Sequence, residues 1–177
     1  FGIGADVAVD PGADVAQVRR AVDDAAAIGL VAVLVNNAAV FPSGPFVDVT
    51  PATYDHAHAV NQRAYFFVAQ AAARHMIQQR RGSIVNIGSI TQHGGWPNIV
   101  AYVTFKGAVA AFTRALATEL GPHDVRVNCV APGMTATEAA ENGWDARGFD
   151  AAGIAKHAFS LGRYGPMREV SQASVFF

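Results

Sequence analysis

Three short runs rich in valine and isoleucine, separated by longer helical stretches, constrain the fold of this chain more than any other feature. The runs occupy Val31–Val35, Ser83–Ile87 and Val125–Val130, and none of them alternates apolar with polar residues. Parallel strands covered on both faces have this continuous apolar character, whereas strands with one solvated face alternate. The pattern predicts buried parallel strands joined by helical crossovers.

The stretches between these runs have helical spacing. Ala13–Ala27 carries an apolar stripe, and Thr50 followed by Pro51 suits the N-cap and first position of a helix that continues to about Arg80. A third helix is expected over Ile99–Leu120. It is predicted to turn five apolar side chains toward the core: Val103, Ala110, Phe112, Leu116 and Leu120.

Composition excludes several classes of function. The chain has 177 residues, 51% of them hydrophobic and 15% charged, which predicts one globular domain over residues 1–177. A net charge of −1 gives no basic patch for nucleic acid. The uncharged stretch Ala25–Val47 is interrupted by glycine, asparagine and proline, so no membrane span is expected, and the opening residues do not resemble a secretory signal. The single cysteine, Cys129, favours a buried thiol and a reducing, cytoplasmic setting.

The strand–helix pattern loosens after Val130. Residues 132–165 are rich in Gly, Thr, Asn and alternating charges, include Trp144, and predict short helices at most. Irregular segments of this length within a compact domain are usually functional. We therefore expect residues 132–165, called the lid segment below, to cover a substrate.

The residues that indicate chemistry are Ser89, Tyr102 and Lys106. Four positions separate Tyr102 from Lys106, so on a helix they share a face, and a nearby ammonium favours the phenolate form of a tyrosine. Ser89 follows a predicted strand, at the carboxyl edge where open α/β sheets bind ligands. Each has an ordinary structural alternative: the Tyr–Lys pair could be incidental on an amphipathic helix, and Ser89 could be a turn residue.

Several motifs in order resemble the short-chain dehydrogenase/reductase family. The resemblance covers essentially the whole chain and rests on Asp6-Val7, Asn36-Asn37-Ala38-Ala39, Val60-Asn61, Ser89 with Tyr102 and Lys106, and Pro132-Gly133-Met134-Thr135-Ala136-Thr137. It implies a Rossmann-like, doubly wound parallel sheet in three α/β/α layers. It also implies an oxidoreductase that uses NAD or NADP to interconvert a ketone and a secondary alcohol, with an oxoacyl thioester or a sugar or polyol as substrate.

The resemblance assigns roles to individual residues. Tyr102 would be the general acid and base, Lys106 would lower its pKa and bind the nicotinamide ribose, Ser89 would orient the substrate oxygen, and Asn61 would hold a water that relays protons. The implied cofactor-binding residues are Asp6, Val7, Asn37, Ala38, Ala39, Tyr102, Lys106, Pro132, Gly133, Thr135 and Thr137. His93 and Trp96 lie between Ser89 and Tyr102 and are expected to contact substrate.

Two departures from the family pattern qualify these expectations. Ala39 stands where the family usually has glycine, and no Gly-rich phosphate loop opens a helix, because Gly2-Ile3-Gly4 leads directly into Ala5-Asp6. The resemblance places that loop and its flanking βαβ unit before Phe1, together with the residue that discriminates NAD from NADP. It also places a last strand after a shortened final helix, Glu169–Phe177.

Three further expectations follow from the same comparison and from the remaining residues. The two helices around His56–Gln79 and Ala101–Leu120 form a four-helix interface in the family, which implies a homotetramer or homodimer. No metal site is expected, because His56 and His58 point in different directions on a helix. A non-catalytic member that binds a ligand or partner is the alternative reading of function.

Overall fold

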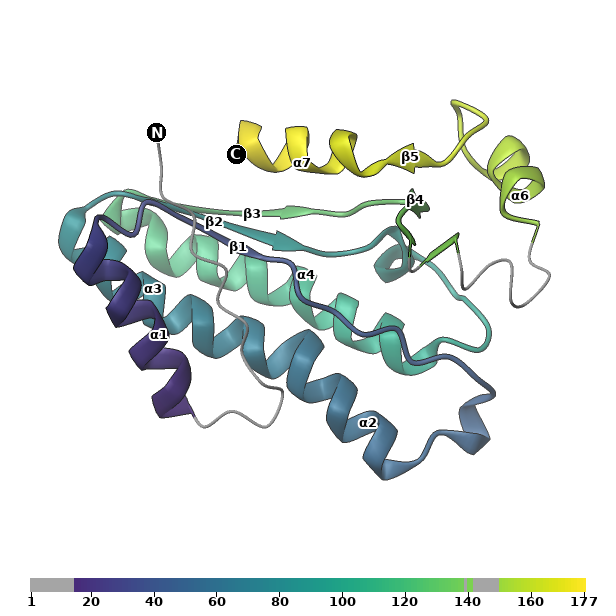
Figure 1. The fold of residues 1–177 in the computed structure, drawn as a ribbon, viewed down its shortest axis with the longest axis horizontal. Helices are drawn as coiled ribbons and strands as arrows, with labels where there is room; N and C mark the ends of the chain where they lie inside the picture. The colour runs from purple at the N-terminus through teal and green to yellow at the C-terminus, as the bar shows by residue number, and fades with distance from the viewer. Residues whose placement is uncertain (1–14, 139, 142–149) are drawn as a thin grey trace.

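A three-stranded parallel sheet lies at the centre of the computed structural model, which describes residues 15–138, 140–141 and 150–177 (Figure 1). Its strands are β1 (Val33–Asn36), β2 (Gly82–Ile87) and β3 (Val125–Val130), in the order β1-β2-β3. Val33 lies beside Ser83, and Gly82 lies beside Val125. The three predicted strands are therefore confirmed, and their carboxyl ends meet at one edge.

Helices cover the sheet in two layers of unequal size. The helices α1 (Val15–Ile28), α3 (Ala64–Gln79) and α4 (Val100–Leu120) lie on one side, and α7 (Met167–Phe176) lies on the other (Figure 1). This is the predicted three-layer α/β/α arrangement. The helix α7 begins two residues before the expected Glu169.

The core forms where α3 and α4 pack on the sheet. Small side chains of α3, including Ala69 and Ala72, are buried and let the helix approach the strands closely. Met76 is fully buried against Gly82, where an added β-carbon would lie 2.5 Å from the methionine sulfur. Only glycine fits at this position without a shift of the helix.

The helix predicted over Pro51–Arg80 is interrupted. Thr50 caps α2 (Pro51–His58) as expected, since its hydroxyl accepts from the Thr53 amide at 3.2 Å. A π-helical turn, Ala59–Arg63, then separates α2 from α3. Such turns break the regular i→i−4 ladder and are frequent at functional sites.

The predicted core face of α4 is confirmed in part. Leu120 is buried, and Phe112 and Leu116 are half-buried and pack against the core. The other fully buried side chains of the helix are Ala101, Phe105, Lys106, Val109 and Thr113, whereas Val103 and Ala110 are half-buried. A hydropathy stripe excludes lysine and threonine from a core face, but both are buried here because β2 supplies their partners: the Lys106 Nζ donates to the Ile87 carbonyl, and the Thr113 hydroxyl accepts from Asn86 Nδ2. The helix ends at Leu120, and Gly121–His123 follow as a 3₁₀ turn.

The sequence predicted that all three strands are covered on both faces, and β1 departs from this prediction. Within the described residues β2 is buried from Gly82 to Asn86, but Val33 and Val35 of β1 remain 59% and 46% exposed. Beyond β3, the two-residue strands β4 (Thr135–Ala136) and β5 (Gly165–Pro166) pair in parallel, and the short helix α6 (Ala151–Ala158) lies between them in the chain. No helix in the described part of the chain is long and apolar enough to cross a membrane.

Candidate active site

Ser89, Tyr102 and Lys106 come together at the carboxyl end of β2. Ser89 lies two residues after the end of that strand, and Tyr102 and Lys106 lie on the first two turns of α4. The Ser89 hydroxyl lies close enough to the Tyr102 phenol to lower its pKa, and the Lys106 Nζ lies 5.7 Å from the centroid of the Tyr102 ring. The structure therefore assembles the three predicted residues into one cluster.

The hydroxyl of Ser89 is set up as a hydrogen-bond donor. Ser89 is 7% exposed, and its Oγ accepts from the Thr91 amide at 3.2 Å and from the Thr91 hydroxyl at 3.0 Å. A hydroxyl oxygen has two lone pairs and one hydrogen. Because Thr91 uses both acceptor positions, the Ser89 hydrogen is left to donate toward the phenol or toward a substrate oxygen.

Burial keeps the Tyr102 phenol protonated. It raises the pKa of Tyr102 above its ordinary value, and the hydrogen bond with Ser89 opposes that shift without cancelling it. Desolvation therefore determines the net direction of the shift, and the expected lowering of this pKa by Lys106 stays a prediction. A protonated phenol at neutral pH suits a general acid. The ring is held edge-on by Phe41, with centroids 4.6 Å apart.

Lys106 is a buried lysine whose Nζ is held by a backbone carbonyl. It is 1% exposed, and its Nζ donates to the Ile87 carbonyl at 2.7 Å. Burial lowers the pKa of Lys106 from 10.5 to about 8, and the nearby Cys129 acts weakly in the opposite direction. Both the ammonium and the amine are therefore accessible near physiological pH.

Asn61 braces the loop that follows β1. It is fully buried in the π-helical turn, its Nδ2 donates to the Val40 carbonyl at 2.8 Å, and its Oδ1 accepts from the Val40 amide at 2.8 Å. The amide group thus pairs with both backbone groups of one residue. That bond pair fixes the segment Asn37–Val40 relative to the helix, and the expected water-holding role of Asn61 stays a prediction.

A buried polar network beneath the site was not anticipated. Asn36 Nδ2 donates to Asn86 Oδ1 at 2.8 Å, Asn86 Nδ2 donates to the Thr113 hydroxyl at 3.0 Å, and that hydroxyl donates to the Val109 carbonyl at 2.8 Å. The network ties β1, β2 and α4 together. The sequence did contain a signal for this network, namely one asparagine within each of two apolar strands, Asn36 and Asn86. A buried amide side chain requires a hydrogen-bond partner.

The predicted cofactor residues at the strand ends lie at the same edge. Asn37, Ala38 and Ala39 are exposed after β1. The segment Pro132–Thr137 follows β3, and the Pro132 carbonyl accepts from the Ile90 amide at 3.0 Å, which places this segment against the turn that begins at Ser89. Asp6 and Val7 lie outside the described residues.

This edge fits part of a dinucleotide cofactor. The backbone of Asn37–Ala39 is accessible, and the buried Lys106 ammonium can donate to ribose hydroxyls. Gly133 is exposed, and a β-carbon there would lie 3.3 Å from the Phe159 ring, so glycine leaves space between the backbone and that ring. Thr135 donates to the Gly133 carbonyl at 3.3 Å, and Thr137 caps the following turn by accepting from the Ala140 amide at 3.1 Å.

The two predicted substrate residues lie in the loop before α4. His93 is exposed and its Nε2 lies 3.0 Å from Gln92 Nε2, while Trp96 is 43% exposed. Within the described residues, neither the His93 nor the Trp96 side chain hydrogen-bonds Tyr102. Substrate contact by this loop therefore stays a prediction. Among the residues that the structure describes, no group of three His, Cys, Asp or Glu side chains could hold a metal ion.

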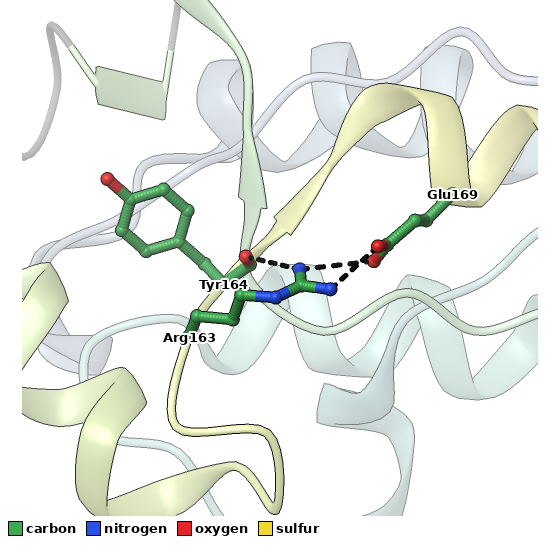
Figure 2. Close-up of polar contacts among 3 residues, drawn as sticks. All are labelled: Arg163, Tyr164 and Glu169. Atoms are coloured by element: carbon green, nitrogen blue, oxygen red, sulfur yellow. Dashed lines mark hydrogen bonds and ion pairs between the residues drawn. The ribbon is translucent and has the colours of Figure 1, made fainter.

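An ion pair fixes the end of the lid segment (Figure 2). Arg163 Nη2 donates to Glu169 Oε1 at 2.7 Å, and its Nη1 donates to Glu169 Oε2 at 3.3 Å and to the Tyr164 carbonyl at 3.2 Å. The Tyr164 ring points away from the pair. The pair links Arg163, which lies just before β5, to Glu169 on the first turn of α7. It therefore fixes the backbone at the end of the lid segment. Trp144 lies outside the described residues.

Comparison with known proteins gives concordant matches. A family model described as Enoyl-(Acyl carrier protein) reductase matches residues 4–177. The gluconate 5-dehydrogenase of Gluconobacter oxydans is 36% identical over 175 residues, covering 92% of this chain and 64% of that protein. A crystal structure of a gluconate 5-dehydrogenase from Burkholderia cenocepacia, in complex with NADP and tartrate, superposes with a TM-score of 0.85 at 33% identity, covering 92% of this chain and 64% of that one.

One relative has a different description. A protein of Xanthobacter autotrophicus named inactive 2-(S)-hydroxypropyl-CoM dehydrogenase 2 is 35% identical over 183 residues, covering 99% of this chain and 76% of that protein. The chain spans between 44% and 76% of the length of the curated relatives it matches. The family-model match, over residues 4–177, extends through the strands, the site cluster and α7.

Proposed function

Since this chain belongs to the short-chain dehydrogenase/reductase family, we propose that the protein containing it interconverts a ketone and a secondary alcohol by hydride transfer with NAD or NADP. The observation that carries the proposal is the cluster of Ser89, Tyr102 and Lys106, in which Ser89 and Lys106 are buried and Tyr102 is half-buried. A cluster of donors at the carboxyl edge of a parallel sheet suits a carbonyl substrate.

In the proposed reaction, the residues of this chain manage the oxygen and its proton. The Ser89 hydroxyl donates to the carbonyl oxygen and fixes its position, and Tyr102 Oη gives that oxygen a proton as charge develops on it. The bound dinucleotide supplies or accepts the hydride. Lys106 orients the ribose and stabilises the phenolate that remains on Tyr102, and the reverse sequence oxidises the alcohol.

A sugar, sugar acid or polyol is the proposed substrate class. The support comes from the gluconate 5-dehydrogenases among the relatives and from the exposed polar loop around His93 beside the site. An oxoacyl thioester is the second substrate class, in keeping with the name of the matching family model. A substrate panel with both compound classes and both dinucleotides, run on the full-length protein, distinguishes them.

The catalytic assignment is tested with Tyr102→Phe. This variant keeps the ring packed on Phe41 but removes the proton donor, so turnover is expected to fall about 10²–10⁴-fold while dinucleotide affinity stays within about twofold. Tyr54→Phe, at a tyrosine on α2 that is 43% exposed, is the matched control and should keep its activity. Near-normal turnover by Tyr102→Phe would contradict the assignment.

A non-catalytic role is the competing hypothesis, and the inactive relative from Xanthobacter supports it. Under that hypothesis the protein binds a dinucleotide or another ligand without converting any substrate. The intact site cluster favours catalysis, because a protein that only binds has no need for a buried lysine beside a tyrosine. Dinucleotide binding by calorimetry together with no turnover across the panel would favour the binding role.

We also propose that the protein is a cytoplasmic homotetramer or homodimer assembled through α3 and α4. Phe66 on α3 is 48% exposed, and its ring lies 5.3 Å from that of Phe112 on α4, which forms an aromatic patch across both helices. Light scattering on the wild type and on Phe66→Glu tests this, since the charge should dissociate the assembly. A monomeric wild type would refute it.

A further inference from the structure

Tyr65 lies against Lys106 from a different element of the fold. It belongs to α3, is 2% exposed, and its hydroxyl donates to the Ile87 carbonyl at 3.3 Å. The same carbonyl accepts from the Lys106 Nζ at 2.7 Å. One backbone oxygen at the end of β2 therefore holds both side chains.

The ring of Tyr65 also approaches the charge on Lys106. The Nζ lies 5.4 Å from the centroid of the Tyr65 ring and 5.7 Å from that of the Tyr102 ring. A cation within about 6 Å of an aromatic face is attracted by the ring quadrupole, and more strongly when the pair is desolvated. The ammonium is thus flanked by two aromatic rings and anchored on one carbonyl.

We infer that Tyr65 is a positioning residue whose ring face holds the Lys106 ammonium in place and in its charged form, beside the Ile87 carbonyl that both side chains share. The inference rests on the proposed function for its consequence in catalysis, but not for its effect on Lys106 itself. Tyr65 does not exchange protons in this role, because burial raises the pKa of its phenol far above neutrality and leaves the hydroxyl as a donor.

The aromatic rings are the principal support for the charge on Lys106, because the other groups that face it do not carry an opposite charge. The titratable groups around it are Tyr65 from α3, Tyr102 from its own helix and Cys129 from β3. Burial raises the pKa of the Cys129 thiol, so it is predominantly neutral near pH 7. None of the ion pairs recorded in the described residues involves Lys106. The charge therefore depends on the Ile87 carbonyl and on the two ring faces.

The inference is tested by measuring the pKa of Lys106 directly. Nitrogen-15 NMR of the full-length protein labelled at the lysine Nζ gives a titration curve for each lysine, and the signal missing from Lys106→Met identifies the one of interest. Replacing Tyr65 with leucine removes the ring, so the pKa should fall by about 0.5–1.5 units, the range that cation–π energies correspond to. Tyr65→Phe keeps the ring and should stay within about 0.3 units of the wild type.

A second pair of variants keeps the test valid if Tyr65→Leu does not fold. Phenylalanine and trifluorophenylalanine, incorporated at position 65, have nearly the same shape, but fluorine withdraws the negative charge from the ring face. The pKa of Lys106 should be lower with the fluorinated ring. An equal pKa in this pair, or an unchanged pKa in a folded Tyr65→Leu, would overturn the inference.

An activity measurement links this result to the proposed reaction. In an active enzyme, the alkaline limb of the pH profile of kcat should move to lower pH in the fluorinated variant by the same amount as the Lys106 pKa. The NMR titration does not depend on turnover. Failure of the proposed function would therefore appear as missing activity with the pKa shifts intact, whereas failure of the inference would appear as unchanged pKa values.

Discussion

At the scale of single side chains, Thr91 determines what the Ser89 hydroxyl can do. It donates to Ser89 Oγ from both its amide and its hydroxyl. Thr91→Val removes the hydroxyl bond, which frees one acceptor position on Ser89 and lets its hydrogen rotate away from the site. We expect kcat/KM to fall about 3–10-fold, the usual value of one hydrogen bond.

The matched control for this prediction is Thr91→Ser, which keeps a hydroxyl at the same position and should remain within about twofold of the wild type. Steady-state kinetics with the best substrate of the panel provide the measurement. Equal activity of the valine and serine variants would show that Thr91 has only a local structural role in the turn.

Lys106 makes stability depend on pH. Its pKa is about 8 in the folded chain against 10.5 when unfolded, so the unfolded chain binds more protons between these values. The free energy of unfolding should therefore gain a positive slope between pH 8 and 10.5, and the destabilisation should be complete and constant below pH 8. Lys106→Met should raise stability at pH 7 by about 1–3 kcal/mol more than it does at pH 10.5.

Urea unfolding at the two pH values measures this difference. Lys156→Met on α6 is the control, because that lysine is exposed and its replacement should have the same small effect at both pH values. A stabilisation by Lys106→Met that is equal at pH 7 and pH 10.5 would contradict the depressed pKa. Loss of turnover in the stabilised variant would show that the reaction requires the charged Lys106 even though this charge destabilises the fold.

At the scale of elements, Asn61 couples the π-helical turn to the loop after β1. Asn61→Leu has a similar volume but leaves both backbone groups of Val40, a half-buried residue, without their partner. Unpaired buried groups of this kind cost about 1–3 kcal/mol each, so we expect a total loss of about 2–4 kcal/mol in urea unfolding. Gln62→Leu, on the same turn but partly exposed, should cost less than about 1 kcal/mol, and equal losses in the two variants would refute the brace.

The sequence predicted the elements that depend on local pattern and missed those that depend on tertiary pairing. All three strands and the Thr50 cap followed from residue type and spacing. The π-helical turn did not, because its geometry is fixed by the contact between Asn61 and Val40, 21 positions apart. The burial of Lys106 and Thr113 on α4 was missed for a related reason, because both depend on partners in β2: Lys106 donates to the Ile87 carbonyl, and Thr113 accepts from Asn86.

The candidate site shows the same division. The motif order was sufficient to group Ser89, Tyr102 and Lys106, which the structure brings together. The direction of the Tyr102 pKa was not predictable, because spacing indicates which charges are near but not how deeply a phenol is buried. Tyr65 stood out only as part of the aromatic segment Tyr65-Phe66-Phe67 that follows Asn61 in the family resemblance, and it received no role, since nothing in the local sequence indicates that its ring faces a lysine on α4.

At the scale of the whole molecule, the ion pair between Arg163 and Glu169 connects the lid segment to α7 (Figure 2). Both side chains are exposed, so Glu169→Gln should change the melting temperature by less than about 2 °C. It should instead loosen the β4–β5 pair, in which the Gly165 amide donates to the Met134 carbonyl at 3.0 Å. We expect faster amide exchange at Gly165 and a raised KM with little change in kcat.

Arg80→Gln provides the control for this prediction. It breaks a comparable exposed pair, with Asp124 at 2.7 Å, away from the lid segment, and should leave exchange at Gly165 unchanged. Hydrogen exchange by mass spectrometry over peptides spanning β4 and β5 makes the comparison. High salt should reproduce part of the Glu169→Gln effect in the wild type, because surface pairs are screened.

The pairing of β4 with β5 has a consequence for how such proteins diversify. Thr135 lies beside Gly165 in the pair, so the chain enters and leaves the intervening residues at adjacent points. The cost of closing a loop grows slowly with its length, and a loop whose ends meet can change size without moving its base. We therefore expect the connection between β4 and β5 to be exchangeable as a unit. Grafting this connection from a relative is expected to leave the sheet and the cluster of Ser89, Tyr102 and Lys106 unchanged.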